Sequence, residues 1–310
     1  MCLYVGNKNG FVTKEDITVY KVLKKGADGY KTPYQGYPVK LGKDLIPAGD
    51  PAFDEHGYKF SLNGGAIHAY LNPVEARRND NGGEIFKATI PAGTRMWIQD
   101  DLNQVAARKL HITKDTVSRA TEQLYIKTLE SLVPQFALEV LLMDKSIVSV
   151  QEGRERKGVI GIKVGKHIVS TEWFQDVAFC TSRIINTAKT MNFEEADCDM
   201  NGEENQRDIL LKNPDLEFPA FEKARKLGGY VPAIGELKEA FLSLAEINIT
   251  RFALGLENIP WGYWFYSSSM RSADSVWYLN SLGYWFYWLC YDCLFCRYHV
   301  LPFFSSCEEG

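Results

Sequence analysis

Three cysteines near the end of the chain have a spacing that could bind a metal. Cys290, Cys293 and Cys296 are each three residues apart, which resembles the first three ligands of a bacterial iron–sulfur sequence. The fourth cysteine of that pattern is absent. Zinc could instead take His299 or Cys307 as its fourth ligand. The spacing therefore leaves an iron- or zinc-binding, cysteine-dependent enzyme as an alternative function.

An acidic segment upstream has the polar residues of a calcium-binding loop. Two features depart from that loop, because Glu204 stands where a hydrophobic residue is usual and the last ligand position holds Asp rather than Glu. We therefore expect a solvated acidic turn and no resident cofactor, with calcium as the alternative. The residues at the ligand positions are Asp197, Asp199, Asn201, Glu203 and Asp208.

Other catalytic arrangements are missing from the sequence. It holds no Ser-His-Asp set, phosphate-binding loop or zinc-protease sequence, and its five histidines are scattered. Before residue 113, His68, Arg77 and Arg78 are the side chains most suited to chemistry, yet nothing pairs with them at a catalytic spacing. We expect a half-buried histidine, a solvated helix face, and a protein that is not an enzyme.

The composition is that of a folded protein with an unusual C-terminal segment. Of the 310 residues 45% are hydrophobic, which excludes a disordered chain, and the formal net charge of −4 argues against nucleic acid as a partner. Residues 261–310 hold five of the seven Trp, seven of the 16 Tyr, five of the 17 Phe and four of the seven Cys. They contain no Lys, and an ordinary globular tail does not have this composition.

The stretch from Tyr284 to Phe304 has the length and apolar character of a membrane-spanning helix. Asp292 and Arg297 would each cost roughly 2.5–3.5 kcal/mol near the centre of such a helix. No lysine cluster flanks the stretch to orient it. We therefore expect no membrane insertion.

The first part of the chain is predicted to be a small α/β or mainly β module over residues 1–112. Alternating apolar residues predict strands over 16–23 and 84–90. An Asn-Pro pair, suited to the cap and the first helical position, predicts a helix over 73–78.

A helix is predicted over 113–133, with Thr113 as its cap and an apolar stripe at helical spacing. Pro134 is expected to end or kink it. We interpret residues 113–142 as a helical connector between two domains.

The remaining chain alternates predicted strands with predicted helices and loses all helical periodicity after Asn258. Together with the first module this indicates an α+β fold. The predicted strands cover 146–150, 159–164 and 166–170, and the predicted helices cover 219–227 and 235–244.

Short motifs follow one another in a recognisable order in this second part. The first are Asn201-Gly202-Glu203-Glu204-Asn205, with Ile209 after it, and Gly228-Gly229-Tyr230-Val231-Pro232-Ala233-Ile234-Gly235-Glu236-Leu237. The later ones are Tyr263-Trp264, Ser267-Ser268-Ser269, Trp277-Tyr278-Leu279-Asn280 and Val300-Leu301-Pro302. In this order they resemble a bacterial family with a C-type-lectin-like fold, over roughly residues 143–310. Leu301 stands where that family usually has Arg, and Phe265-Tyr266 is inserted before the serines.

Within that fold the chain resembles the variable proteins of diversity-generating retroelements, which occur in gut bacteria and their phages. In these systems a reverse transcriptase copies a template with errors at adenines, and the randomised codons are typically Asn codons. Such codons cannot become codons for Trp, Met, Lys, Glu or Gln. Residues 284–299 contain no Met, Lys, Glu or Gln and many Tyr, Phe and Cys. The resemblance therefore implies that Trp285 and Trp288 are fixed framework residues.

The resemblance implies a ligand-binding display protein whose lectin-like domain carries a variable region at about 261–304. Aromatic side chains suit such a surface, because they give a large contact area at a small entropic cost. The residues expected to bind ligand are Tyr263, Phe265, Tyr266, Tyr284, Phe286, Tyr287, Leu289, Cys290, Tyr291, Asp292, Cys293, Phe295 and Tyr298. The residues expected to form the framework are Trp264, Trp277, Trp285, Trp288 and Pro302.

The resemblance also implies a protein or glycan as the partner, and anchoring of residues 1–112 to a phage tail or cell-surface structure. The N-terminus has no basic segment followed by a long apolar one, so we expect no secretory signal. We expect the protein in the cytoplasm or on a phage particle. A structural phage or cell-surface subunit, with the aromatic tail as its interface, is the second alternative beside the cysteine-dependent enzyme.

Overall fold

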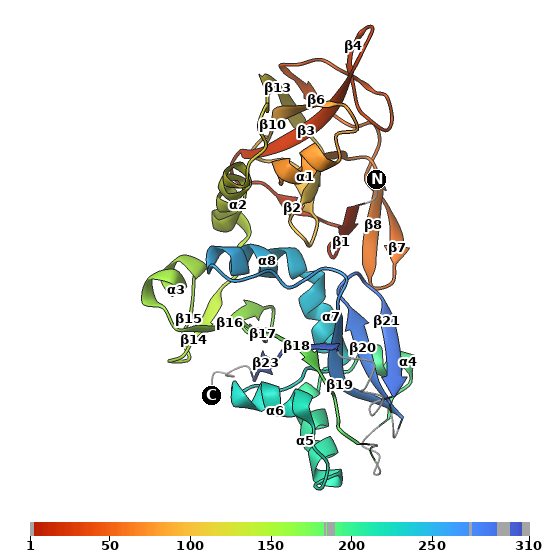
Figure 1. Ribbon diagram of the computed structural model, residues 1–310, viewed down its shortest axis with the longest axis vertical. Helices are drawn as coiled ribbons and strands as arrows, with labels where there is room; N and C mark the ends of the chain where they lie inside the picture. The colour runs from red at the N-terminus through yellow and green to blue at the C-terminus, as the bar shows by residue number, and fades with distance from the viewer. Residues whose placement is uncertain (1–2, 183, 185–189, 273–274, 290–297, 306–310) are drawn as a thin grey trace. The chain divides into compact units, whose positions relative to one another are not determined.

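The chain is α+β, as the sequence predicts, with eight helices and mostly antiparallel sheets in its described part. No helix within that part is long and apolar enough to cross a membrane. For residues 285–289 the backbone alone is described. The computed structural model describes residues 3–182, 184, 190–272, 275–289 and 298–305 (Figure 1).

Two compact units make up the chain. Unit 1 contains residues 1–137 and 248–258, and unit 2 contains residues 138–247 and 259–310. Helix α8 (Leu244–Ala253) begins in unit 2 and continues into unit 1.

Unit 1 is built on antiparallel sheets with strand orders β2-β11-β12-β9-β3-β10-β13-β6 and β1-β8-β7, while β4 joins β3 to β5. The predicted strands at 16–23 and 84–90 are confirmed as β3 and β10, which pair from Ile17 opposite Ile90 to Leu23 opposite Glu84. The strands are β1 (Leu3–Val5), β2 (Phe11–Val12), β3 (Ile17–Gly26), β4 (Gly29–Lys31), β5 (Pro38–Val39), β6 (Lys43–Leu45), β7 (Ala52–His56), β8 (Lys59–Gly64), β9 (Ile67–Tyr70), β10 (Glu84–Ile90), β11 (Arg95–Ile98), β12 (Gln104–Ala107) and β13 (Leu110–Thr116).

Helix α1 (Pro73–Arg78) begins where the sequence predicts. The Asn72 side chain accepts hydrogen bonds from the backbone N–H groups of Val74 at 3.0 Å and Glu75 at 3.4 Å. These bonds satisfy two of the donors that a helix start leaves unpaired. Apolar side chains of α1, β3, β9 and β10 then form one buried cluster, made of Tyr20, Val22, Tyr70, Ala76 and Ile85.

The predicted helix at 113–133 is wrong at its start. Residues Leu110–Thr116 form strand β13, which pairs with both β10 and β6, and helix α2 covers Glu122–Phe136. Thr121 caps α2, accepting a hydrogen bond from Leu124 N at 3.4 Å, and Pro134 lies inside its last turn. Residues 110–116 form a strand because the neighbouring strands β10 and β6 pair with its backbone N–H and C=O groups. The local sequence does not reveal this pairing.

A buried ion pair lies in unit 1. Lys59 Nζ is 2.5 Å from Asp100 Oδ2, and the two side chains are 0% and 2% exposed. The side-chain amide of Asn248 donates a hydrogen bond to the backbone carbonyl of Asp100 at 2.9 Å. These contacts link the segment 248–258 to the strands of its own unit.

Unit 2 contains two five-stranded sheets, with orders β15-β14-β16-β17-β23 and β18-β22-β19-β20-β21. Every strand pair in them is antiparallel except β19 with β22. In Figure 1, β19, β20 and β21 form the blue part of the second sheet. The strands are β14 (Val140–Leu142), β15 (Ile147–Val148), β16 (Val159–Val164), β17 (His167–Ser170), β18 (Phe174–Val177), β19 (Trp264–Ser272), β20 (Ser275–Asn280), β21 (Trp285–Leu289), β22 (Tyr298–Val300) and β23 (Phe303–Phe304).

Most elements predicted for this part of the chain are confirmed. The strands at 159–164 and 166–170 are β16 and β17, and the helices at 219–227 and 235–244 are α6 and α7. The strand predicted at 146–150 is shorter, because Ser149 caps a helix that starts at Val150. The helices of unit 2 before α8 are α3 (Val150–Arg156), α4 (Phe193–Asp197), α5 (Gly202–Lys212), α6 (Pro219–Lys226) and α7 (Ile234–Leu242).

The buried ion pair of unit 1 generates a stability prediction. Lys59→Met should lower the free energy of unfolding of this unit by about 3–5 kcal/mol, because it leaves the Asp100 carboxylate buried without its cation. Lys43→Met, at an exposed position on β6, should change it by less than about 0.5 kcal/mol. Urea unfolding followed by far-UV circular dichroism measures both. Equal stabilities of the two variants would contradict the proposed role of the pair.

Candidate functional site

Two of the residues expected to bind ligand are exposed at the same end of the β19–β20–β21 sheet. Tyr263 is 46% exposed and Tyr284 is 45% exposed. A turn between them holds both backbones: Asn280 N donates to Tyr284 O at 2.9 Å and Ser281 N donates to Tyr263 O at 3.0 Å. The Asn280 side chain also donates to Gly262 O at 2.8 Å. The Trp-x-x-Asn motif therefore positions this end of the sheet.

Two other expected ligand-binding residues lie in the core, which corrects the expectation that they are displayed. Phe265 is 0% exposed and its ring packs 5.1 Å from that of Phe241 on α7. Tyr266 is 6% exposed and its ring lies 5.3 Å from that of Phe179. Adjacent residues of a strand point to opposite faces, and here both faces of β19 are covered.

Aromatic rings connect the exposed end of the sheet with its interior. Tyr298 on β22, half-buried, stacks on Tyr278 with ring centroids 4.7 Å apart. The ring of the exposed Tyr263 lies 4.7 Å from the imidazole of His299, which is itself 7% exposed. Large rings packed in this way hold the neighbouring strands at fixed positions.

The framework residues that can be placed lie inside or at the edge of the core. Trp277 is 6% exposed and donates from Nε1 to Met191 O at 3.2 Å. Trp264 is half-buried against Tyr278, and Pro302 is buried. Trp285 and Trp288 contribute their backbones to β21.

The other expected ligand-binding residues cannot be assigned a surface. Phe286, Tyr287 and Leu289 lie on β21, where only the backbone is described. The rest lie outside the described residues, namely Cys290, Tyr291, Asp292, Cys293 and Phe295.

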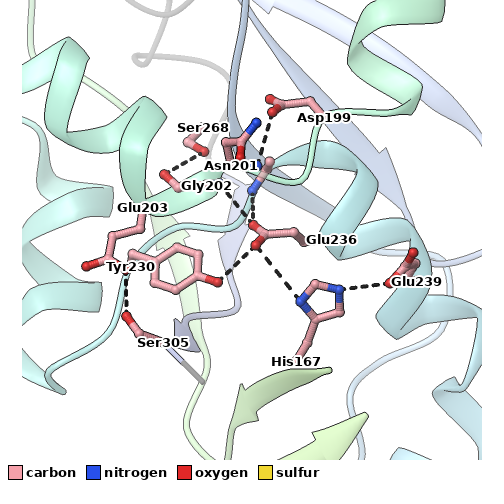
Figure 2. Close-up of polar contacts among 11 residues, drawn as sticks. His167, Asp199, Asn201, Gly202, Glu203, Tyr230, Glu236, Glu239, Ser268 and Ser305 are labelled. Carbon is pink, nitrogen blue, oxygen red and sulfur yellow. Dashed lines mark hydrogen bonds and ion pairs between the residues drawn. The ribbon is translucent and has the colours of Figure 1, made fainter. Parts of the chain in front are cut away.

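Behind the β19–β20 sheet lies a buried polar network centred on one carboxylate (Figure 2). Glu236, near the start of α7, is 4% exposed. Its Oε2 accepts hydrogen bonds from Ala233 N at 2.7 Å and from Gly202 N at 3.2 Å, and its Oε1 accepts one from the Tyr230 hydroxyl at 3.0 Å. Burial raises the pKa of Glu236 to about 7, although these three hydrogen bonds oppose the shift.

Gly202 is in contact with Glu236 because it has no side chain. A Cβ at this position would lie 2.4 Å from Glu236 Oε2 and 2.5 Å from Ala233 N. The Asn-Gly turn and the Gly-Glu-Leu segment, which are separate motifs in the sequence, are therefore in direct contact.

Three buried serines lie on β19, and two of them, Ser268 and Ser269, form hydrogen bonds with these motifs. Ser267, Ser268 and Ser269 are each 0% exposed. Ser268 donates from Oγ to Gly202 O at 3.2 Å, and its N–H donates to Pro232 O at 2.8 Å. Their hydroxyls are hydrogen-bonded within the protein, as buried polar groups require.

The segment expected to be a solvated acidic turn, with a calcium loop as the alternative, is partly buried. Asp199 is 6% exposed, and its Oδ2 accepts hydrogen bonds from Asn205 Nδ2 at 2.6 Å and Ser269 Oγ at 2.5 Å. From Gly202 onward the chain is helix α5, so Glu203 and Asp208 point outward on a helix rather than inward from a loop.

The remaining residues of the calcium alternative have partners of their own. Asp197 pairs with Lys238 at 2.5 Å, and Asp208 pairs with Lys212 at 2.9 Å. Glu203 accepts a hydrogen bond from Ser305 at 2.6 Å. Nowhere among the described residues do three or more His, Cys, Asp or Glu side chains gather as metal ligands would. In the described structure these carboxylates are therefore bound by groups of the protein itself.

The sequence did not single out His167, which also belongs to the network. His167 is 6% exposed; its Nε2 lies 2.8 Å from Glu239 Oε2, and its Nδ1 lies 3.9 Å from Glu236 Oε1. Burial lowers the pKa of His167, although Glu239 acts against the shift. His167 lies on β17, far from α7 in the sequence, so no local spacing could have connected it with Glu236.

Comparisons with known proteins leave the family open. No family model matches the chain, and no curated protein matches it. A solved structure of a fimbrial protein from Bacteroides ovatus is similar at a TM-score of 0.44 and 9% sequence identity. The similarity covers 92% of this chain and 63% of that one, so this chain spans less than two thirds of that protein's length.

The buried carboxylate generates a pH prediction. Its pKa is about 7 in the folded state against an ordinary value of 4.5, so the folded state binds more protons than the unfolded state between these values. The wild type should therefore lose stability relative to Glu236→Gln as the pH rises from 4.5 to 7, by up to about 1.4 kcal/mol per pH unit. Gln keeps the shape of Glu and carries no charge.

Urea unfolding followed by tryptophan fluorescence suits this measurement, because six of the seven tryptophans lie in unit 2. Glu204→Gln, on the exposed face of α5, is the control and should follow the wild type. If the wild type and Glu236→Gln have the same pH dependence, the pKa of Glu236 is the same in the folded and unfolded states and is not raised by burial.

Proposed function

We propose that the protein is a non-enzymatic display protein that binds a protein or glycan ligand. In this proposal unit 2 is a C-type-lectin-like domain whose C-terminal surface is diversified by a retroelement. Unit 1 anchors it to a phage tail or cell-surface structure.

The contacts among the motifs support the lectin-like part of the proposal. The Asn-Gly turn, the Gly-Glu-Leu segment and the serine run carry the resemblance, and they meet at Glu236 and Ser268. The Trp-x-x-Asn motif supplies Trp277 to the core and Asn280 to the turn at the end of the sheet. Motifs that are characteristic of one fold are expected to contact one another in the folded chain.

The observation that carries the display function is the change in burial along the sheet. Tyr263 and Tyr284 are exposed, whereas Phe265 and Trp277 close to them are buried. The sheet is thus anchored by fixed rings and offers large aromatic side chains to solvent at one end. A binding surface needs both properties, because a rigid support avoids the entropic cost of ordering the side chains on binding.

Sequencing the locus tests the diversification. We expect a reverse-transcriptase gene and a near-identical repeat of the segment encoding about residues 261–304, differing from it at adenines. Codons for Trp277 and Glu236 should be unchanged among isolates, while those for Tyr263 and Tyr284 vary. A locus without such a repeat would refute the retroelement part of the proposal and leave a binding domain of constant sequence.

Stability measurements test the division between support and surface. Tyr263→Ser and Tyr284→Ser should each lower the free energy of unfolding by about 1 kcal/mol, because both residues are partly exposed to solvent in the folded state. Phe265→Ser should lower it by about 3–5 kcal/mol, because it leaves a cavity in the core. Tryptophan fluorescence in urea gives all three values. A large loss at both tyrosines would make them part of the core and contradict a freely variable surface.

A further inference from the structure

Unit 1 contains a cavity of about 570 Å³, a size typical of sites for small molecules. Its wall comes from β3 and β9, from the turn after β8, and from two loops at 32–38 and 45–48. Hydrogen bonds close the first loop, since Thr32 N donates to Tyr37 O at 2.9 Å and Tyr37 N donates to Thr32 Oγ1 at 3.0 Å. These two bonds hold the ends of the loop together.

The described lining includes Lys21 but no Asp or Glu. Lys21 is 9% exposed, and its Nζ donates to the backbone carbonyl of His68 at 2.5 Å. An ammonium group has three donors, and no carboxylate in the described part of the chain pairs with this one. Burial lowers the pKa of Lys21 to about 8, as expected for a cation without a counter-ion.

His68 adds a second polar group to the lining. Its Nδ1 is buried and has no hydrogen-bond partner in the described part of the chain. Burial and the neighbouring Lys21 lower the pKa of His68 to about 4, so the imidazole is neutral at pH 7. Lys21 therefore carries the positive charge of this pair of residues. A buried polar atom without a partner is uncommon in native proteins and requires an explanation.

The rest of the lining is mixed, and its aromatic and aliphatic part is suited to an apolar body. Tyr34 and Tyr37 are 65% and 56% exposed on the first loop, and Tyr70 lies opposite on β9 with 7% exposure. Aliphatic and proline side chains complete the wall at Pro33 and Ile46, among others. The cavity thus combines an aromatic and aliphatic wall with a single buried cation.

We propose that this cavity binds a small organic carboxylate, whose charged group pairs with Lys21 and whose apolar body lies against the tyrosines. A carboxylate supplies the missing counter-ion and occupies the donors that Lys21 leaves unused. It also removes the cost of a buried unpaired ammonium, which a neutral ligand of the same shape cannot do. All the residues that line this site belong to unit 1.

Binding to the full-length protein tests the proposal with three probes, namely 4-phenylbutyrate, indole-3-acetate and octanoate. Isothermal titration calorimetry should detect at least one of them, and the neutral analogue 4-phenylbutanamide should bind at least about tenfold more weakly than 4-phenylbutyrate. Above the Lys21 pKa of about 8, the dissociation constant of the carboxylate should rise about tenfold per pH unit, while that of the amide stays constant.

Lys21→Met should reduce the affinity for the carboxylate at least tenfold without changing that for the amide. Lys87→Met is the matched control, because Lys87 is an exposed lysine on the neighbouring strand β10 and does not line the cavity. The comparison of acid and amide uses the wild type, so it remains decisive even if Lys21→Met does not fold. Equal binding of acid and amide, or no binding of any probe at 10 mM, would overturn the proposal.

Discussion

The carboxylate of Glu236 joins segments of unit 2 that lie far apart in the sequence. It binds the N–H of Gly202, the N–H of Ala233 and the hydroxyl of Tyr230, all away from solvent. A carboxylate in such a place is stable only with these partners, since each lost hydrogen bond leaves a desolvated acceptor. Strand β19 is fastened to the same two motifs through Ser268. The two motifs that hold β19 through Ser268 are therefore themselves joined by this carboxylate.

Buried and partly exposed aromatic side chains lie close together at one end of the β19–β20–β21 sheet. Phe265 and Trp277 are buried, whereas Tyr263 and Tyr284, whose backbones are held by the turn at Asn280, are partly exposed. Partly exposed side chains can be exchanged with a smaller effect on packing than buried ones. This physical separation is what a binding surface of changing sequence requires.

Two buried lysines of unit 1 have different surroundings and therefore different roles. Lys59 is paired with the carboxylate of Asp100 and belongs to the core. Lys21 is also buried, but within the described part of the chain its Nζ bonds to a backbone carbonyl rather than to a carboxylate, at the wall of a cavity. The same kind of ammonium group is thus structural in one place and the basis of a proposed ligand site in the other, because among the described residues a carboxylate pairs with the first and none with the second.

The sequence by itself determined the features that depend on neighbours in the chain. The start of α1 at Asn72, the strands β3 and β10, and the motif around Glu236 were all predictable, since capping, alternation and turn residues act locally. Tertiary structure decided the rest. Residues Leu110–Thr116 became a strand because β10 and β6 flank them, and Phe265 was buried because α7 covers its face of β19. Contacts between distant residues, including those of Lys21 and His167, leave no periodic trace in the sequence, because only the folded chain brings their partners together.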